Sequence, residues 1–519
     1  MSAIAQSDLK APTDLRDRIA QLVMIRIGSN LPPILRVHED EQRVAHALEQ
    51  CPVGGLLLFN GTWPESRETL DRLQSQSEVP LLVASDIERG AGQQVAGLTQ
   101  FPHQRAFVDL QDADNHLADF AKATTREARA TGIHVTFGPV ADVNSDPRNP
   151  IIATRAFGDE PARVGELVAS YVRAMEGTGL LSCAKHFPGH GDTHQDSHDA
   201  MPSVGVSKEA LLARELVPFQ AAIDAGVAMF MTAHVEYPAL DPTGAPATLS
   251  KPILVDLLRG EMGFEGVVCS DSLLMAGVRG RFDSEGEMAI ATLNAGVDLL
   301  LDIEDHVAVV DSLTRAVEDN RLSVERVDEA FDRVWRLKQK AFSGTDDGPP
   351  TVEQQTEAAE IADRIALAAT SVIADSGSLK LPLPADGPLT ALLFKPHHRP
   401  TDPSEQPLAA ALRERFASVR YFETGPDISE SLEADLLAGA PADTPILVAM
   451  IVKPAAWHAF GLTKDQNALV KRLLKQRPVV LACLGVKEAL DDFLEAPLAI
   501  CTHSDSICSQ KALAQKLAL

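Results

Sequence analysis

The sequence predicts an α/β protein in which a closed (β/α)₈ barrel of the TIM type precedes a smaller α/β layered domain, an αβα sandwich. The first observation is that short apolar runs alternate with amphipathic helical stretches from residue 19 to about 340. Continuous apolar runs are typical of parallel strands that are buried on both faces. The second is the repeat number, because eight such units in roughly 320 residues fit a closed barrel better than an open sheet. The third is the length of 519 residues, which indicates about two domains.

The predicted barrel strands are short apolar runs followed by turn residues or polar side chains. They are Leu22–Ile27, Gly55–Phe59, Leu81–Ser85, His134–Val140, Leu180–Ala184, Val227–Thr232, Gly266–Ser270 and Val297–Leu301. Helical patterns separate them, of which the clearest are Asn115–Ala130, Pro161–Glu176, Lys208–Ala225 and Pro252–Met262. Two further helical patterns, Val307–Glu318 and Ser323–Phe342, are predicted to close the barrel.

The segment Ser343–Pro350, which reads SGTDDGPP, has the composition of a linker. We therefore assign residues 1–345 to the (β/α)₈ barrel and residues 346–519 to a linker helix and the C-terminal domain. The linker helix is predicted over Thr351–Ala374. Strand-like runs then alternate with helices, which predicts the layered domain; the runs are Leu389–Phe394, Pro445–Val452, Pro478–Leu484 and Leu498–Thr502.

Charge and composition restrict the partners that we expect. The net charge of −26 argues against nucleic acid and against an anionic membrane, because either would repel the chain. No apolar run approaches the ~20 residues of a membrane span, and the first residues lack the apolar region of a signal peptide. Six cysteines are scattered without a CxxC pair. We therefore expect a cytoplasmic protein with reduced thiols.

Polar residues recur just past the apolar runs. They are Asp86, Asp142, Lys185 with His186, His234 and Asp271. Each follows a different predicted strand, and barrel enzymes build their sites from the carboxyl ends of strands and the loops after them. A barrel without a catalytic role needs no polar residue at five strand ends, so the pattern predicts an enzyme.

The densest polar stretch is Cys183–Pro202, which reads CAKHFPGHGDTHQDSHDAMP and contains four histidines, three aspartates and a lysine. Three interpretations are open. A metal site is possible in terms of ligand type, but the spacing matches no zinc signature such as HExxH. A solvated loop is the second interpretation. The third is acid–base catalysis by Asp196 and His198, in which the carboxylate fixes the imidazole tautomer and raises its basicity.

The motif KHFPGHG followed by DSH resembles the signature of glycoside hydrolase family 3, in its β-N-acetylhexosaminidase branch. The resemblance implies an Asp–His dyad in place of the usual carboxylic acid/base. It makes His198 the acid/base and Asp196 its partner. Lys185 and His186 would bind sugar hydroxyls.

Asp271, in GVVCSDSLLMAGV, is the nucleophile candidate. From the residues alone, the cap of a following helix is an equally good interpretation. The resemblance favours the nucleophile, because family 3 nucleophiles are similar in context and follow a run like Gly263–Val267.

The same resemblance implies further sugar-binding residues: Asp86 in LLVASDIERG, Arg155 in NPIIATRAFG and His234 in MTAHVEYP. The alternatives are a turn before Gly90, a solvated loop charge and a structural histidine. Members of this branch commonly carry an arginine inside the segment after the first Asp. The corresponding segment here, ERGAGQQV, differs because Arg89 comes early and glutamines stand at Gln93 and Gln94, which affects the outer sugar contacts and the preference for the leaving group.

The resemblance implies a retaining exo-β-N-acetylglucosaminidase that cleaves terminal β-linked N-acetylglucosamine from cell-wall or chitin-derived oligosaccharides, with a place in peptidoglycan recycling. It would act through a covalent glycosyl-aspartate, without a cofactor or metal. A neutral imidazole does not repel an anionic acceptor, so a β-N-acetylglucosaminide or β-glucoside phosphorylase that uses inorganic phosphate is the main alternative. A broader β-glucosidase, a metal-dependent hydrolase and a non-catalytic sugar-binding barrel are the others.

Overall fold

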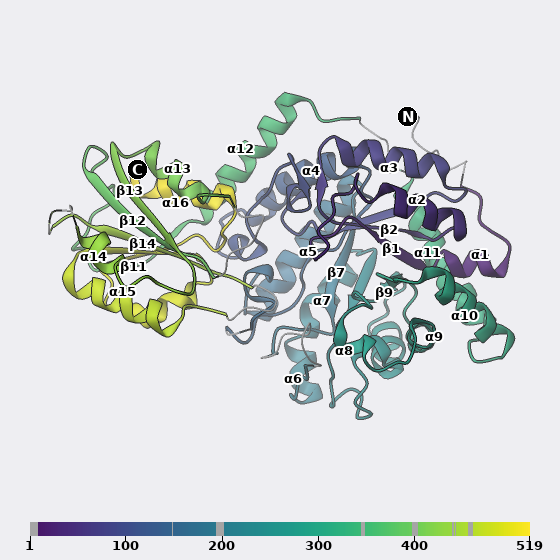
Figure 1. The fold of residues 1–519 in the computed structure, drawn as a ribbon. Helices are drawn as coiled ribbons and strands as arrows, with labels where there is room; N and C mark the ends of the chain where they lie inside the picture. Colours follow the sequence, from purple (N-terminus) through teal and green to yellow (C-terminus); the bar gives the residue numbers. More distant parts are fainter. Residues whose placement is uncertain are drawn as a thin grey trace. The chain divides into compact units, whose positions relative to one another are not determined.

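The computed structural model describes residues 9–147, 149–193, 202–343, 348–396, 403–438, 441, 443–454 and 460–518. The chain divides into two compact units (Figure 1). The first comprises Met1–Thr99, Asp114–Asp146 and Gly158–Ala358, and the second comprises Gln100–Ala113, Pro147–Phe157 and Ala359–Leu519. Two short segments between barrel strands therefore cluster with the C-terminal part of the chain. The predicted domain boundary after residue 345 stays a prediction.

The first unit contains the predicted eight-stranded parallel barrel. Its strands are β1 (Val23–Ile27), β2 (Gly55–Leu58), β4 (Leu82–Ser85), β6 (Val135–Thr136), β7 (Leu181–Phe187), β8 (Met229–Thr232), β9 (Val267–Cys269) and β10 (Leu300–Leu301). The sheet order is β10-β1-β2-β4-β6-β7-β8-β9, and a parallel bridge between Cys269 and Leu299 joins the two ends. Every strand overlaps a predicted run, which confirms the barrel, although β7 continues past the predicted end at Ala184 to Phe187.

Helices connect successive strands, as a parallel sheet requires. They are α2 (Glu41–Gln50), α3 (Glu65–Gln76), α4 (Ala113–Thr131), α5 (Pro161–Thr178), α6 (Lys208–Ala213), α7 (Leu216–Asp224), η6 (Pro252–Glu261), α8 (Ala276–Arg279) and α9 (Glu285–Ala295). Helix α1 (Leu15–Ala20) precedes β1, and α10 (His306–Glu318) and α11 (Val324–Ala341) follow β10. Two short strands, β3 (Gly61–Thr62) and β5 (Val95–Ala96), pair outside the barrel. The helical turns are η2 (Ala91–Gln93) and η5 (Ala247–Leu249).

Local sequence explains where these helices begin and end. Helix α5 begins where the Glu160 side chain accepts the backbone N–H groups of Ala162 and Arg163, and it ends at Gly179 in the left-handed conformation (φ +92°). The single helix predicted over Lys208–Ala225 is wrong in one respect, because it is interrupted between α6 and α7. The interruption places Glu215 in the interior, fully buried.

The amino-terminal end of the barrel is filled by charged groups with compensating partners. Lys338 of α11 is fully buried, and its Nζ atom donates to Pro80 O (2.8 Å) and to the Gln21 side chain. Asp298, which precedes β10, is also fully buried and accepts from three arginines, Arg259, Arg326 and Arg333. Polar groups at this end therefore stabilise the fold, whereas barrel enzymes place their catalytic residues at the carboxyl end of the strands.

The second unit is built on a six-stranded sheet of order β11-β16-β15-β14-β12-β13. Its strands are β11 (Ser371–Asp375), β12 (Pro388–Phe394), β13 (Ser418–Thr424), β14 (Ile446–Val452), β15 (Val479–Gly485) and β16 (Leu498–Cys501). All neighbours are parallel except β11, which runs antiparallel to β16. The helical elements are α12 (Val352–Ala369), η3 (Gln104–Phe107), η4 (Ala153–Arg155), α13 (Pro407–Arg413), α14 (Leu432–Leu437), α15 (Lys464–Gln476), η7 (Lys487–Phe493) and α16 (Ile507–Ala518).

Two apolar layers cover the faces of this sheet. Alternate residues of β15 enter different cores: Val480 and Leu484 pack with α13 and α16, whereas Val479 and Leu481 pack with α14, α15 and η7. Helices therefore lie on both faces (Figure 1), which confirms the predicted αβα sandwich.

Two edge strands differ from the prediction. The helix predicted over Thr351–Ala374 ends at Ala369, and residues 371–375 form β11 instead. Strand β13 is absent from the sequence prediction, because its residues are only half-buried and form no continuous apolar run. Within the described residues, no helix is both long and apolar enough to cross a membrane.

Candidate active site

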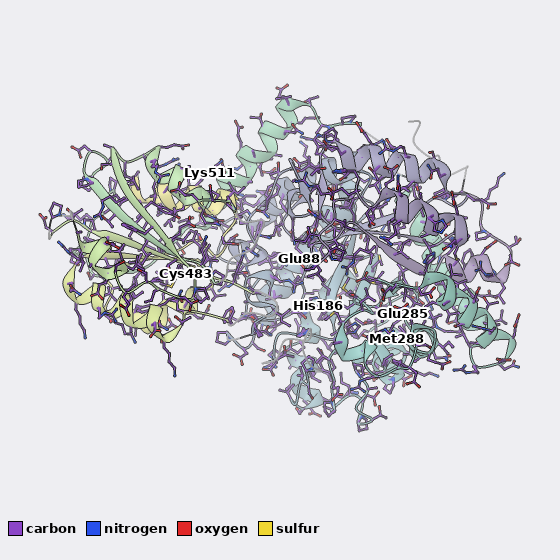
Figure 2. All side chains as sticks on the ribbon, viewed as in Figure 1. Glu88, His186, Glu285, Met288, Cys483 and Lys511 are labelled. Carbon is purple, nitrogen blue, oxygen red and sulfur yellow. The ribbon has the colours of Figure 1, made fainter. Side chains whose placement is uncertain are left out.

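The polar residues predicted at the strand ends of the barrel lie at one end of its sheet. Asp86 follows β4, Lys185 and His186 lie near the carboxyl end of β7, His234 follows β8 and Asp271 follows β9. These strands are parallel, so their carboxyl ends share one face of the barrel. His186 and Glu88 are labelled in Figure 2. The structure thus gathers five of the eight predicted site residues.

The other three are placed elsewhere. Arg155 is the last residue of η4, in the second compact unit, and its Nη1 atom donates to Ile151 O at 3.3 Å. Asp196 and His198 fall in residues 194–201, outside the described residues. The dyad therefore stays a prediction.

Lys185 joins two carboxylates. Its Nζ atom lies 2.6 Å from Asp86 Oδ1 and 2.7 Å from Glu88 Oε1. Lys185 and Glu88 are buried, whereas the Asp86 side chain is 31% exposed. The buried ion pair fixes the lysine, and the exposed carboxylate keeps oxygen lone pairs that can accept sugar hydroxyls. Glu88 is missing from the sequence prediction, although it lies two residues after Asp86.

A second buried carboxylate, Asp142 at the exit of β6, holds His186. The Nδ1 atom of His186 lies 2.8 Å from Asp142 Oδ2, and the backbone N–H groups of His186 and His190 donate to the same carboxylate. Burial alone raises the pKa of Asp142, but the facing imidazole of His186 and these hydrogen bonds outweigh it, so the pKa is lowered. Because an ionised carboxylate only accepts, the His186 Nδ1 carries the proton.

Asp271 is partly exposed at the exit of β9. Burial raises the pKa of its carboxyl group, but His234, His186, the Ser272 N–H and Lys185 together outweigh burial and lower it. The Ser272 backbone N–H donates to Asp271 Oδ1 at 2.7 Å. Asp271 is therefore ionised at neutral pH, as a carboxylate nucleophile must be.

His234 is held by groups that lie beside Asp271. Its Nε2 atom donates to Ser272 O (3.0 Å), and its Nδ1 atom lies 2.7 Å from Thr248 Oγ1. These contacts support the backbone that follows Asp271. The predicted contact of His234 with the sugar stays a prediction.

Asp302, at the exit of β10, is a further residue that the sequence prediction misses. Arg26 of β1 donates to both of its carboxylate oxygens, and Ser272 Oγ donates to Oδ2 at 2.5 Å. The ion pair connects β1 and β10 with the residue next to Asp271. A strand-end Asp before a turn gives little signal in sequence, because turn-formers look the same.

The loop that precedes residue 194 is fixed by contacts with three other segments. Asp142 accepts from His190 N, Tyr237 Oη donates to Gly189 O (2.5 Å), and Arg214 joins Asp192 (2.7 Å) to the buried Glu215 (2.6 Å). Burial raises the pKa of Glu215 to about 7.

Two glycines allow this close packing. A Cβ atom on Gly189 (φ +126°) would lie 2.8 Å from the Glu215 Cβ, and a Cβ on Gly191 would lie 1.6 Å from Val143 O. The sequence signal for this arrangement is the pair of glycines in PGHG.

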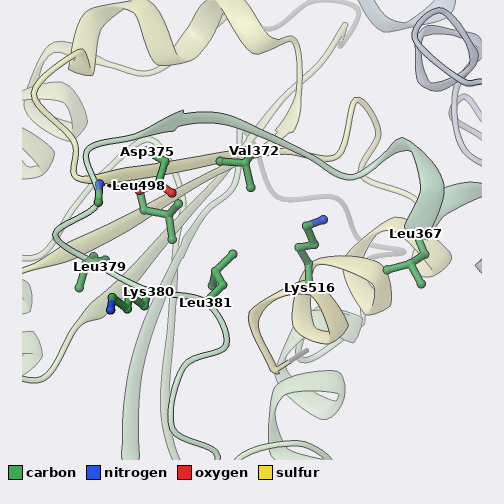
Figure 3. A pocket seen from close by; sticks show the side chains of 9 residues that line it. Leu367, Val372, Asp375, Leu379, Lys380, Leu381, Leu498 and Lys516 are labelled. Carbon is green, nitrogen blue, oxygen red and sulfur yellow. Dashed lines mark hydrogen bonds between the residues drawn. The ribbon is translucent and has the colours of Figure 1, made fainter.

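The described residues contain no group of three or more His, Cys, Asp or Glu side chains arranged to hold a metal ion. The second unit has a cavity of about 720 Å³ between α12, β11, β16 and α16 (Figure 3). Its wall is mostly aliphatic, with Asp375, Lys380 and Lys516 as charged members. The carboxyl end of the barrel, in contrast, combines an ionised carboxylate with fixed donors and acceptors, which is an arrangement for nucleophilic and acid–base chemistry.

Known proteins resemble this chain over most of its length. Residues 14–337 match the family described as glycosyl hydrolase family 3 N terminal domain. Beta-hexosaminidase A of Pseudoalteromonas piscicida is 33% identical over 448 residues, which cover 78% of this chain and 73% of that protein.

Solved structures share the whole fold. A glycoside hydrolase family 3 beta-N-acetylglucosaminidase from Paenibacillus sp. str. FPU-7 matches with a TM-score of 0.84 and 28% identity, covering 98% of this chain and 97% of that one. A beta-glucoside phosphorylase matches with the same TM-score at 22% identity, covering 99% and 93% of the two chains, and so shows the fold alone. The chain belongs to glycosyl hydrolase family 3.

Proposed function

We propose that this protein is a retaining exo-β-N-acetylglucosaminidase that releases terminal β-linked N-acetylglucosamine. The observation that carries the proposal is Asp271, an ionised carboxylate at a strand exit, which faces the groups that lower its pKa. The names of the hexosaminidase and acetylglucosaminidase relatives support an acetylated amino sugar as substrate.

In the first step, Asp271 attacks the anomeric carbon while the bond to the leaving oxygen breaks. Protonated His198 gives its proton to that oxygen, so the leaving group departs neutral. The product is a covalent glycosyl-Asp271 with inverted configuration. In the second step, water attacks the same carbon, His198 takes its proton and Asp271 is released, so the overall configuration is retained. Asp196 orients the imidazole throughout.

The sugar is held by charged and polar groups around its hydroxyls. We assign Asp86 and the Nε2 atom of His186 as acceptors and Lys185 as a donor, because Lys185 is fixed by Glu88 and the tautomer of His186 by Asp142. Arg155 is assigned to the same sugar from the resemblance. Hydrogen bonds to charged partners strengthen when water is excluded, which favours the hydroxyl pattern that fits.

Phosphorolysis is the second candidate, because a histidine acid/base leaves the site without a second carboxylate that would repel phosphate. The first step is unchanged, and phosphate then replaces water. The deciding experiment is product analysis on an aryl β-N-acetylglucosaminide, with and without inorganic phosphate. If the first product is the β-anomer of free N-acetylglucosamine, the enzyme is a hydrolase. If the product is the sugar 1-phosphate, it is a phosphorylase.

The same experiment tests the other candidates. Faster cleavage of a plain β-glucoside than of the N-acetyl sugar would favour a β-glucosidase, and binding without turnover would favour a sugar-binding barrel. Activity that survives a chelator would remove the metal-dependent hydrolase. Chitin-derived and cell-wall oligosaccharides are the natural substrates to compare, and a cytoplasmic place in peptidoglycan recycling stays a prediction.

A further inference from the structure

We propose that Arg105 is the centre of a binding site for an oxyanion, a phosphate or a carboxylate group, in the second compact unit. Arg105 lies on the helical turn η3 and is 7% exposed. Its Nη1 atom is completely buried without a hydrogen-bond partner, and no described residue makes a hydrogen bond or ion pair with its guanidinium. Arg105 is thus a buried cation that the described part of the protein leaves uncompensated.

Other buried charges in the described structure do have compensation. Lys185 is paired with Asp86 and Glu88, and the buried Asp298 accepts from Arg259 and its two neighbouring arginines. Even Lys338, which faces no carboxylate, donates to two oxygens. A lysine can lose its proton when buried, but a guanidinium cannot, so Arg105 stays charged. A buried charge is costly unless it is paired, and an anion from outside the chain would supply the pair.

A second arginine lies on the turn that packs against η3. Turn η4 ends at Arg155, and Phe107 and Phe157 pack edge to face with ring centres 6.4 Å apart, which fixes the two turns together. Residues 100–108 and 149–157 contain no Asp or Glu, although the chain carries a net charge of −26. The two turns themselves therefore carry two arginines and no acidic residue, and Asp505, which lies 3.8 Å from His103, is ion-paired with Lys453.

The chemistry of the guanidinium selects the ligand class. Its planar fork of N–H donors matches the paired oxygens of a carboxylate or a phosphate. A neutral sugar hydroxyl would leave the charge uncompensated. An oxyanion satisfies both the donors and the charge.

The ligand is either free inorganic phosphate or a molecule that carries a carboxylate. The two sources share the same chemistry and differ in the test.

The test is thermal unfolding of the wild type and of Arg105→Met in a chloride-containing zwitterionic buffer, with inorganic phosphate or acetate added at constant ionic strength. We expect at least one oxyanion to raise the melting temperature of the wild type. Arg105→Met should bind it about tenfold or more weakly, since it loses the charged hydrogen bonds. Without oxyanion, Arg105→Met should melt no lower than the wild type, because an apolar side chain of similar size replaces an uncompensated charge.

Arg413→Gln is the matched control, because Arg413 is an exposed arginine of the same unit, paired with Glu405. It should respond to the oxyanion like the wild type. A response to phosphate alone assigns the site to phosphate, and a response to acetate alone assigns it to a carboxylate. If Arg105→Met does not fold, Arg105→Lys takes its place. It keeps the charge without the planar fork and should fold with a weaker response.

Three results would overturn the site: no response in the wild type, an equal response in Arg105→Met or Arg105→Lys, or a lower melting temperature of Arg105→Met without oxyanion. Hydrolysis of an aryl β-N-acetylglucosaminide by the wild type is measured separately in the chloride buffer. Absence of that turnover would overturn the proposed function, whereas the melting temperatures report on Arg105 alone.

Discussion

Asp142 and His186 form a buried pair in which the His186 Nδ1 atom lies 2.8 Å from the Asp142 carboxylate. The same carboxylate accepts the backbone N–H groups of His186 and His190, so one side chain fixes both the ring and the chain around it. The Nε2 atom of His186 is thereby defined as the nitrogen available to a substrate.

We predict that Asp142→Asn lowers kcat/KM about ten- to a hundredfold, the equivalent of one charge-assisted hydrogen bond of about 1.5–3 kcal/mol. The amide has one acceptor oxygen in place of two, so the imidazole loses its fixed tautomer. The measurement is kcat/KM with an aryl β-N-acetylglucosaminide, together with the melting temperature. Asp241→Asn is the control, because Asp241 is a buried carboxylate that binds Thr243 and Ser250. Equal kcat/KM in both variants would refute the role of Asp142.

We predict that Gly189→Ala is destabilising by about 1–3 kcal/mol and lowers kcat, because it adds a Cβ atom 2.8 Å from the Glu215 Cβ at a left-handed φ of +126°. Gly205, just past the polar stretch Cys183–Pro202, has no atom within 4 Å of an added Cβ and serves as the control. Chemical denaturation and kcat of Gly189→Ala and Gly205→Ala are compared. If the two variants behave alike, the loop is not held as tightly as the structure indicates.

We predict that the buried Lys338 makes the free energy of unfolding depend on pH. Burial lowers the pKa of Lys338 to about 7, against an ordinary value of 10.5. Between these values the unfolded chain binds one more proton than the folded protein, so this residue makes the free energy of unfolding rise with pH, by at most about 5 kcal/mol. Lys338→Met should be more stable than the wild type at pH 6, and the difference should shrink by pH 9.

Urea denaturation at several pH values checks this prediction. Lys511→Met, which removes an exposed lysine near Asp363, is the control and should show no such trend. A difference between Lys338→Met and the wild type that stays constant from pH 6 to pH 9 would contradict a depressed pKa.

The barrel was predictable because its strands are buried on both faces and therefore form continuous apolar runs. The edge strands of the second unit were not, since β11 exposes Val372 and Ile373 and is reached from a long helix without a glycine or proline. Sequence periodicity reports burial, so an exposed strand next to a helix is assigned to the helix.

Site residues could be predicted where their position after an apolar run identifies them, as for Asp86, Lys185 and Asp271. They could not be predicted where their role depends on a contact with a segment distant in the sequence. Glu88 belongs to the site because it forms an ion pair with Lys185, which comes from a different strand. Glu215 belongs to it because its side chain packs against Gly189. Such contacts between distant segments leave no periodic trace in the sequence.

The dyad assignment predicts how leaving groups affect His198→Ala. If His198 is the acid, aryl N-acetylglucosaminides with leaving groups of high pKa should lose the most activity, because they depend most on protonation. Asp196→Ala should act in the same direction less severely, since it leaves the imidazole in place. The measurement is the rate at which each variant cleaves a series of aryl N-acetylglucosaminides, plotted against the pKa of the phenol that leaves. A slope no steeper than that of the wild type, in a protein that melts normally, would remove the dyad.

Asp271 is assigned as the nucleophile. Asp271→Ala should fold like the wild type and lose nearly all turnover, because no other group attacks the anomeric carbon. The most direct measurement is the product that this variant forms from an activated aryl β-N-acetylglucosaminide in the presence of azide. The proposed mechanism predicts partial recovery of activity with a glycosyl azide of inverted anomeric configuration. Turnover of Asp271→Ala near the wild-type rate, with no azide adduct, would contradict it.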